Sequence, residues 1–179
     1  MEAAGRARVF FALWPDNAAR DTLAELAVAA RAECGGRATP ADKIHLTLFF
    51  IGAVARARIA DLQGCAAAVA AAPFELELNR LGYWRHNRIV WAGAERSPAA
   101  LTGLVTDLSA KLAALGYQAE DRPYVPHVTL VRNARHAPQQ TRLALLRWRA
   151  GALALVESVN EGGAARYRVI AKWPFGASA

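Results

Sequence analysis

The chain has few cysteines, and their positions suggest neither a metal ribbon nor a disulfide framework. Cys34 and Cys65 stand alone, and no Cys-x-x-Cys pair occurs. Such usage is typical of a reducing compartment, and we expect the cytoplasm. The first apolar run is too short for a signal peptide and stops at Pro15. No segment approaches the roughly 18 apolar residues of a membrane span, so we expect a soluble protein without a membrane partner.

Signatures of several catalytic classes are also missing. There is no Gly-x-x-x-x-Gly-Lys-[Ser/Thr] loop to cradle the phosphates of ATP. There is no Gly-x-Ser-x-Gly segment to present a nucleophilic serine, and no His-Glu-x-x-His helix to bind zinc. Hydrolysis through a phosphate loop, a serine elbow or a zinc-binding helix is therefore unsupported.

The chain is rich in apolar residues and carries a net positive charge. Its 179 residues are 54% hydrophobic, enough for a substantial core, and fit one domain over 1–179 or two intimately packed lobes. The net charge is +7, with arginine far more common than lysine. This balance favours a polyanionic partner such as nucleic acid or a nucleotide, although a generally basic surface has the same composition.

The order of predicted elements indicates an α+β protein. Apolar runs and alternation predict strands over 9–14, 44–51, 74–81, 88–94, 124–132, 151–160 and 166–175. Helices are predicted over 18–33, capped by Asp16 or Asn17, over 58–72, and from Ser97-Pro98 to Gly116. Residues 137–147 fit either a loop or a short helix, and residues 161–164 fit a hairpin turn.

The same short phrase occurs in both halves of the chain. His45-Leu-Thr47-Leu and His127-Val-Thr129-Leu each follow a strand and a helix, and their histidines are 82 residues apart. No linker or low-complexity segment separates the halves. This order suggests a degenerate internal duplication, and we expect one compact two-lobed unit.

Within a strand, the histidine and threonine of each phrase share one face and the apolar residues share the other. A single such phrase is more often structural, because a half-buried histidine is common on a strand. Two matched copies favour function. If the polar faces meet across a cleft, they bring together two imidazoles and two hydroxyls, a set that no core requires because buried polar groups must be paired.

Acid–base chemistry suits this set better than metal binding. Neither phrase has a nearby Asp, Glu or Cys, and two histidines are too few ligands for a typical metal site. The unperturbed pKa of histidine is ~6.5, so one imidazole can be neutral while another is protonated. One would take a proton from water and the other would give one to a leaving oxygen, while the hydroxyls bind a phosphate group. A cyclic phosphodiester needs no metal for this reaction.

The phrases and their flanks resemble the two-histidine phosphoesterase superfamily. "IHLTLFFIG", "RPYVPHVTLVR", the opening "RVFFALWPDNAARDTL" and the ending "LALVESVNEGGAARYRVIAKWPF" are similar to its LigT-like branch, the RNA 2′,3′-cyclic phosphodiesterases formerly called 2′-5′ RNA ligases. The resemblance implies a bilobal fold with two antiparallel sheets lining a central cleft and helices outside. It also implies hydrolysis of a 2′,3′-cyclic phosphate RNA end to a 2′-phosphate, with no metal or other cofactor and no obligate protein partner.

The resemblance also assigns roles to residues. It makes His45 the proton donor to the leaving 3′-oxygen and His127 the proton acceptor that activates water. It makes Thr47, Thr129 and Arg132 the phosphate-binding residues. Strict alternation, however, turns Arg132 away from the face of His127, unless the strand bulges or ends there.

Other residues near the phrases remain open. Relatives often have a basic residue where this chain has Phe49, which alternation places on the face of His45, either to stack a base or as a rim hydrophobe. Lys43 shares that face and either supplies the missing charge or is simply exposed. The segment "YWRHNR", with Trp84 and His86, fits an RNA-contact loop or a solvated loop anchored by one aromatic. We assign no role to His136, and we expect Phe10, Phe11 and Trp14 in the core.

Three other functions stay open at this point. The same site could run in reverse as an ATP-independent 2′-5′ ligase. It could also act on small cyclic nucleotides or 2′-5′ oligonucleotides. A non-catalytic RNA-binding module is the third, although such a module is expected to have lost one of the four motif residues.

Overall fold

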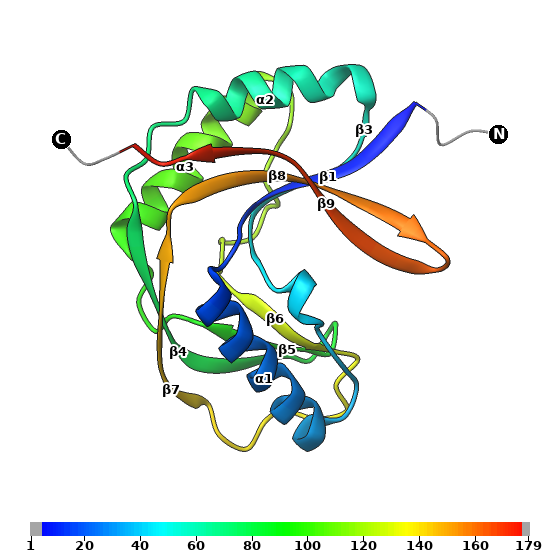
Figure 1. Cartoon of the computed structure of the whole chain (residues 1–179), viewed down its shortest axis with the longest axis vertical. Helices are drawn as coiled ribbons and strands as arrows, with labels where there is room; N and C mark the ends of the chain where they lie inside the picture. The colour runs from blue at the N-terminus through cyan, green and yellow to red at the C-terminus, as the bar shows by residue number, and fades with distance from the viewer. Residues whose placement is uncertain (1–4, 177–179) are drawn as a thin grey trace.

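The computed structural model describes residues 5–176 and shows an α+β architecture (Figure 1). The described strands are β1 (Arg6–Leu13), β2 (Arg37–Ala38), β3 (Leu46–Ala55), β4 (Phe74–Trp84), β5 (Ile89–Gly93), β6 (Val128–Arg132), β7 (Arg142–Ala150), β8 (Ala152–Glu161) and β9 (Ala164–Pro174). The helices are α1 (Asn17–Cys34), α2 (Ile59–Ala67) and α3 (Ala99–Ala114), with short 3-10 turns at Ala41–Lys43 and Arg56–Arg58. The predicted fold class is confirmed.

The sheet consists of two antiparallel parts that meet at one residue pair. Its strand order is β7-β4-β5-β6-β3-β1-β8-β9, and β2 pairs with β6. We call β3, β1, β8 and β9 the first-motif sheet, and β6, β5, β4, β7 and β2 the second-motif sheet. Between β3 and β6 the register contains the pair Leu46–Val128 alone. The two sheets expected from the resemblance are thus continuous at this junction.

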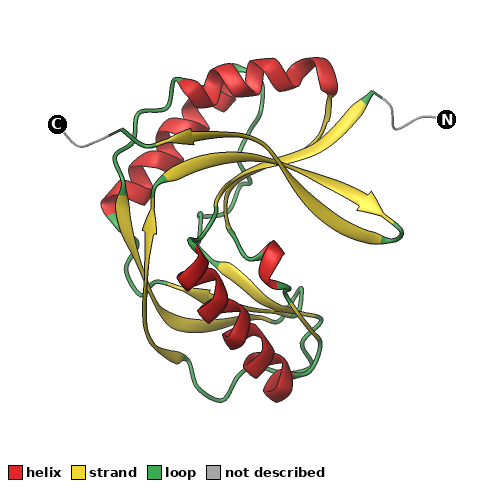
Figure 2. Ribbon diagram, in the orientation of Figure 1, coloured by secondary structure: helices red, strands yellow, loops and turns green. Residues whose placement is uncertain are grey.

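The helices cross between the two parts. α1 follows β1 directly, yet it packs on β6, β2 and β7 of the second-motif sheet. α3 follows β5 but packs on β3, and α2 packs on α3 and β9. Figure 2 shows α1 against the lower part of the sheet and α2 and α3 along the upper part. One hydrophobic cluster therefore draws side chains from both sheets, and neither part buries its apolar face alone.

Local sequence explains the ends of the first helix. The Asp16 carboxylate accepts a hydrogen bond from the backbone N–H of Ala19 at 2.8 Å, as a helix N-cap does. Gly35 ends the helix with a φ of 71°, a conformation that glycine adopts without strain. The predicted cap of α3 is wrong in detail. Pro98, not Ser97, precedes its first helical residue, and no side chain caps the helix.

Three predicted segments differ from the structure. Residues 137–147 were ambiguous between loop and helix, but most of them belong to the strand β7, which pairs with β4. The second helix ends at Ala67 rather than at residue 72. The strand expected over 124–132 begins at Val128, because Pro123 and Pro126 lack the N–H groups that a ladder needs. The predicted turn before β9 is confirmed, with Gly162 and Gly163 both at positive φ.

Trp91 on β5 lies across two glycines, and this packing predicts a strong effect of one methyl group. A Cβ at Gly82 would lie 2.0 Å from Cζ2 of Trp91, and one at Gly93 would lie 2.7 Å from its Cζ3. We expect Gly82→Ala to lower the free energy of unfolding by about 1–3 kcal/mol, because the buried ring must move. In contrast, Gly103→Ala on α3 meets no atom within 4 Å and should stabilise the protein by up to about 1 kcal/mol. Urea unfolding of both variants measures the difference, and equal stabilities would contradict this packing.

Candidate active site

The two His-x-Thr phrases meet at the junction of the two sheets. Leu46 and Val128, the second residues of the phrases, are partners across β3 and β6, and both are fully buried. Because side chains alternate along a strand, the neighbours of these two residues point to the opposite side of the sheet. The polar residues of both phrases therefore lie on one face.

Because β3 and β6 are antiparallel, each histidine backbone lies opposite the threonine backbone of the other phrase. One residue before the junction pair on β3, His45 comes opposite Thr129. One residue after it, Thr47 comes opposite His127. The pairing of Leu46 with Val128 thus brings the backbones of the two phrases side by side.

Both imidazoles are held in the same way. Nδ1 of His45 lies 2.7 Å from the carbonyl oxygen of Lys43, and Nδ1 of His127 lies 2.8 Å from that of Val125. A carbonyl can only accept a hydrogen bond, so Nδ1 donates and Nε2 is the unprotonated nitrogen of the neutral ring. Nε2 of His45 lies 3.0 Å from Oγ1 of Thr47, whose hydroxyl can donate to it. In both rings, Nε2 is left for proton transfer.

Aromatic rings enclose His45. The Trp14 ring stacks on the imidazole with centroids 5.3 Å apart, Phe10 lies 5.0 Å away, and Tyr167 meets it edge-on at 5.3 Å. The prediction that these N-terminal aromatics are core is correct for Phe11, in the main cluster, and for Phe10, which is buried in a second, smaller cluster. It is wrong for Trp14, which is only partly buried. Trp14 packs against the smaller cluster, and both rings lie beside His45.

The rings around His127 come from the second-motif sheet. Trp84, the last residue of β4, meets the imidazole edge-on with centroids 4.4 Å apart, and Trp91 lies 6.5 Å away. From the sequence, Trp84 fits either an RNA-contact loop or the aromatic anchor of a solvated loop, because nothing in its local pattern shows that β4 ends beside the second phrase. The following loop, which contains His86, is exposed.

Burial of the ring is the largest cause of a low pKa at His45, which falls from 6.5 to about 4. The hydrogen bond to the carbonyl of Lys43 acts in the opposite direction. The positive charges of Arg132 and of protonated His127 lower this pKa further. The two imidazoles and the guanidinium are therefore within electrostatic reach of one another.

The pKa of His127 is lowered as well. Burial is again the main cause, the carbonyl of Val125 opposes it, and the charges of Arg122 and Arg132 add to it. With both pKa values below 6.5, both imidazoles are mainly neutral at pH 7 when no anion occupies the site. The sequence had suggested one neutral and one protonated ring.

A cleft of about 360 Å³ opens beside this face. Its wall includes His45 and Thr129, the cations Arg37, Lys43 and Arg132, and the tip of the β8–β9 hairpin. No Asp or Glu is among the residues that line it. Three cations without a carboxylate define a site for an anion. The suggestion that Lys43 contributes charge to the site agrees with its place in this wall.

A β-bulge turns Arg132 toward the cleft. β5 pairs with Thr129 and then with Val131, so Leu130 is an extra residue in β6. One extra residue reverses the alternation, and both Leu130 and Val131 are buried. Arg132 therefore returns to the face of Thr129, which removes the conflict seen in the sequence.

A matching bulge corrects the prediction for Phe49. β1 pairs with Thr47 and then with Phe49, which leaves Leu48 as the extra residue of β3. Phe49 is only 6% exposed and lies in the main core, so the hypothesis that it stacks a base is wrong. Phe50, the partner of Phe10 on β1, is 46% exposed instead, with the guanidinium of Arg8 4.8 Å from its ring centroid. The sequence gives no sign of this shift, because four apolar residues follow one another here.

Tyr124 ties the segment before the second phrase to the first phrase. Its hydroxyl donates to the backbone carbonyl of Thr47 at 2.9 Å. Tyr124 lies three residues before His127, so this hydrogen bond connects the segment that precedes the second phrase directly to the backbone of the first.

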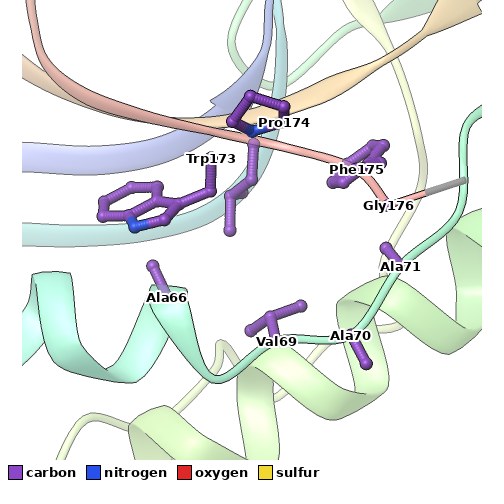
Figure 3. Close-up of a pocket in the computed structure, with 9 residues that line it drawn as sticks. Ala66, Val69, Ala70, Ala71, Trp173, Pro174, Phe175 and Gly176 are labelled. Carbon is purple, nitrogen blue, oxygen red and sulfur yellow. The ribbon is translucent and has the colours of Figure 1, made fainter.

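A second hollow, of about 210 Å³, lies between the end of α2 and β9 (Figure 3). Its wall includes Ala66, Val69, Trp173 and Phe175, and it contains no titratable side chain. It therefore lacks the groups for catalysis. In the described part of the chain, no three His, Cys, Asp or Glu residues gather where they could hold a metal ion. None of the helices described is long and apolar enough to span a bilayer.

Paired His-x-Thr phrases on one face of a two-part antiparallel sheet, beside a cationic cleft, define a two-histidine phosphoesterase. The family model of the 2′-5′ RNA ligase superfamily matches residues 14–162, and the chain belongs to that family.

Known relatives agree with this assignment. The chain is 36% identical over 102 residues to the RNA 2′,3′-cyclic phosphodiesterase of Escherichia coli, a match that covers 57% of this chain and 58% of that protein. It is 28% identical over 177 residues to the protein of the same name from Thermus thermophilus, covering 93% of this chain and 89% of the relative. The structure of E. coli LigT complexed with 3′-AMP superposes with a TM-score of 0.87 and 28% identity, covering 95% of this chain and 98% of that one.

Proposed function

We propose that this chain is a single-domain enzyme that hydrolyses RNA 2′,3′-cyclic phosphate ends to 2′-phosphates, without a cofactor and in the cytoplasm. The pairing of Leu46 with Val128 carries the proposal, because it places an imidazole and a hydroxyl from each phrase on one face. The cationic cleft supplies a place for the phosphate. The names of the curated relatives support the choice of substrate.

In the proposed reaction, His127 takes a proton from water as the water oxygen bonds to phosphorus. The bond from phosphorus to the 3′-oxygen breaks, and His45 gives that oxygen a proton. The products are a 2′-phosphate and a 3′-hydroxyl. Thr47, Thr129 and Arg132 bind the non-bridging oxygens, where negative charge grows in the transition state.

The low pKa of His45 makes its protonation depend on the substrate. In the empty site this ring is neutral at pH 7, so it has no proton to give. A phosphodiester anion in the cleft favours the imidazolium and raises the pKa. We propose that substrate binding therefore loads the donor with its proton. Arg132 counteracts part of this effect by its own positive charge.

The chemical identity of the product tests the proposal. An oligonucleotide with a 2′,3′-cyclic phosphate end is incubated with the enzyme in EDTA, and the product end is identified by digestion and chromatography. We expect a 2′-phosphate. A 3′-phosphate would show that the 2′-oxygen leaves and that His45 does not protonate the 3′-oxygen. Loss of turnover in EDTA would indicate a metalloenzyme, and binding without turnover would indicate a non-catalytic module.

Arg132→Gln tests the phosphate contact. Since a charge-assisted hydrogen bond to phosphate is lost, we expect KM for the cyclic end to rise about 10- to 100-fold. We also expect the pH profile to move to higher pH, because this guanidinium lowers the pKa of both imidazoles. Steady-state kinetics across pH measure both effects. Arg31→Gln on α1 makes the same charge change away from the cleft, and an equal response to it would rule out a specific contact.

A further inference from the structure

Resting on the proposed function, we propose that Arg80 and Arg142 bind backbone phosphates of the RNA strand on the 5′ side of the cyclic end. This pair, which we call the arginine pair, lies on the second-motif sheet at β4 and β7. The preferred substrate is then an oligonucleotide rather than a cyclic mononucleotide.

The arginine pair places like charges side by side. Arg80 and Arg142 are Cα partners across β4 and β7, and both are exposed. Like charges directly opposite each other destabilise a sheet. Further along the same two strands, Arg147 contacts both Glu75 and Glu77. Among the residues described, no ion pair includes Arg80 or Arg142. An anion that binds between these two guanidiniums would relieve their repulsion.

The arginine pair faces the same side of the sheet as the catalytic groups. Leu78 and Leu81 on β4 are buried, and the register with β7 shifts between Leu78 and Arg80. Arg80 is exposed and directly precedes the buried Leu81, so it points away from the core, on the side of position 82. Gly82 is the partner of Trp91, which is itself the partner of Thr129, so all these positions share one face.

An unbroken row of side chains joins the pair to the site. The Arg80 guanidinium carbon lies 5.7 Å from the centroid of Trp91, and that ring lies 6.5 Å from the imidazole of His127. Trp84 packs against both rings at the end of the same strand. Arginines beside aromatic faces are the surface that single-stranded nucleic acid uses for its phosphates and bases. A mononucleotide that fills the cleft has no phosphate to place there.

The double variant Arg80→Gln/Arg142→Gln tests the proposal by binding, without catalysis. Fluorescence anisotropy measures the affinity of a labelled ten-nucleotide single-stranded RNA that ends in a 2′-phosphate. We expect about tenfold weaker binding, and a slope of log affinity against log salt that is smaller by about 1.4, as two lost phosphate contacts predict. The variant Arg20→Gln/Arg31→Gln on α1 has the same change in net charge and should keep the wild-type slope. The thermal midpoint of the arginine-pair variant should be equal to or above that of the wild type, since repulsion is removed.

Kinetics separate this proposal from the proposed function. For the wild type, kcat/KM is measured with a cyclic-phosphate oligonucleotide and with a 2′,3′-cyclic mononucleotide. The arginine-pair variant should lower the ratio of the two values about tenfold. An unchanged ratio together with an unchanged salt slope would overturn the proposal while leaving the hydrolase activity intact. Failure of the wild type to hydrolyse either substrate would overturn the proposed function, and the binding measurement would still decide the role of the arginine pair.

Discussion

Replacing either His45 or His127 with asparagine is expected to lower kcat for a cyclic-phosphate RNA end by a factor of ~10²–10⁴. This is the usual contribution of one positioned proton transfer to the rate. Asparagine is chosen because its amide N–H can still donate to the carbonyl that holds each Nδ1, of Lys43 or of Val125. The double variant should lose much less than the product of the two single losses, since the two rings act in one concerted step. Quenched-flow or steady-state assays in EDTA measure all three.

His136→Asn is the matched control, because His136 is exposed and makes no aromatic contact in the described structure. It should keep wild-type turnover. If either motif variant also retained full activity, the corresponding imidazole would not be part of the reaction. If a variant lost activity while its circular dichroism stayed native, binding of the 2′-phosphate product by calorimetry would show whether the cleft is intact.

The second large effect is on the pH dependence. kcat/KM reports the free enzyme, in which both imidazole pKa values are below 6.5 and that of His45 is about 4. We therefore expect a bell-shaped profile of kcat/KM against pH, with both apparent pKa values below 6.5. Above pH 6.5, kcat/KM should fall about tenfold per pH unit. kcat reports the complex, in which the bound anion raises both pKa values. Its profile should be displaced to higher pH.

Trp14→Ala tests the cause of the low pKa of His45 in the free enzyme. Trp14 stacks on His45, and burial is the largest cause of the low pKa of that ring. Opening this wall to water should raise the pKa of His45 from about 4 toward 6.5 and move one flank of the kcat/KM bell with it. Val28→Ala on α1 removes an exposed apolar side chain and should leave both profiles in place. A flat profile over pH 5–9 in the wild type would count against catalysis by two histidines.

The elements that followed from the sequence are those set by nearby residues. The first helix was predictable because Asp16 caps it, Gly35 ends it and its buried residues recur at helical spacing. β7 was not predictable, because its alternation is interrupted by the exposed Leu145 and by a run of apolar residues. Its strand form depends on pairing with β4, some 70 residues earlier along the chain. Such pairing is a tertiary effect that outweighs weak local propensity.

For the candidate site, the sequence by itself determined which side chains are present and, through the two-residue period of a strand, that each histidine shares a face with its threonine. Only the tertiary structure decided that Leu46 pairs with Val128 and that bulges at Leu48 and Leu130 turn Phe49 inward and Arg132 toward the cleft. It also decided that burial lowers the pKa values of both imidazoles. The physical reason is that register, bulges and burial are fixed by contacts between segments far apart in the chain, and these contacts leave no mark in the local pattern of either segment.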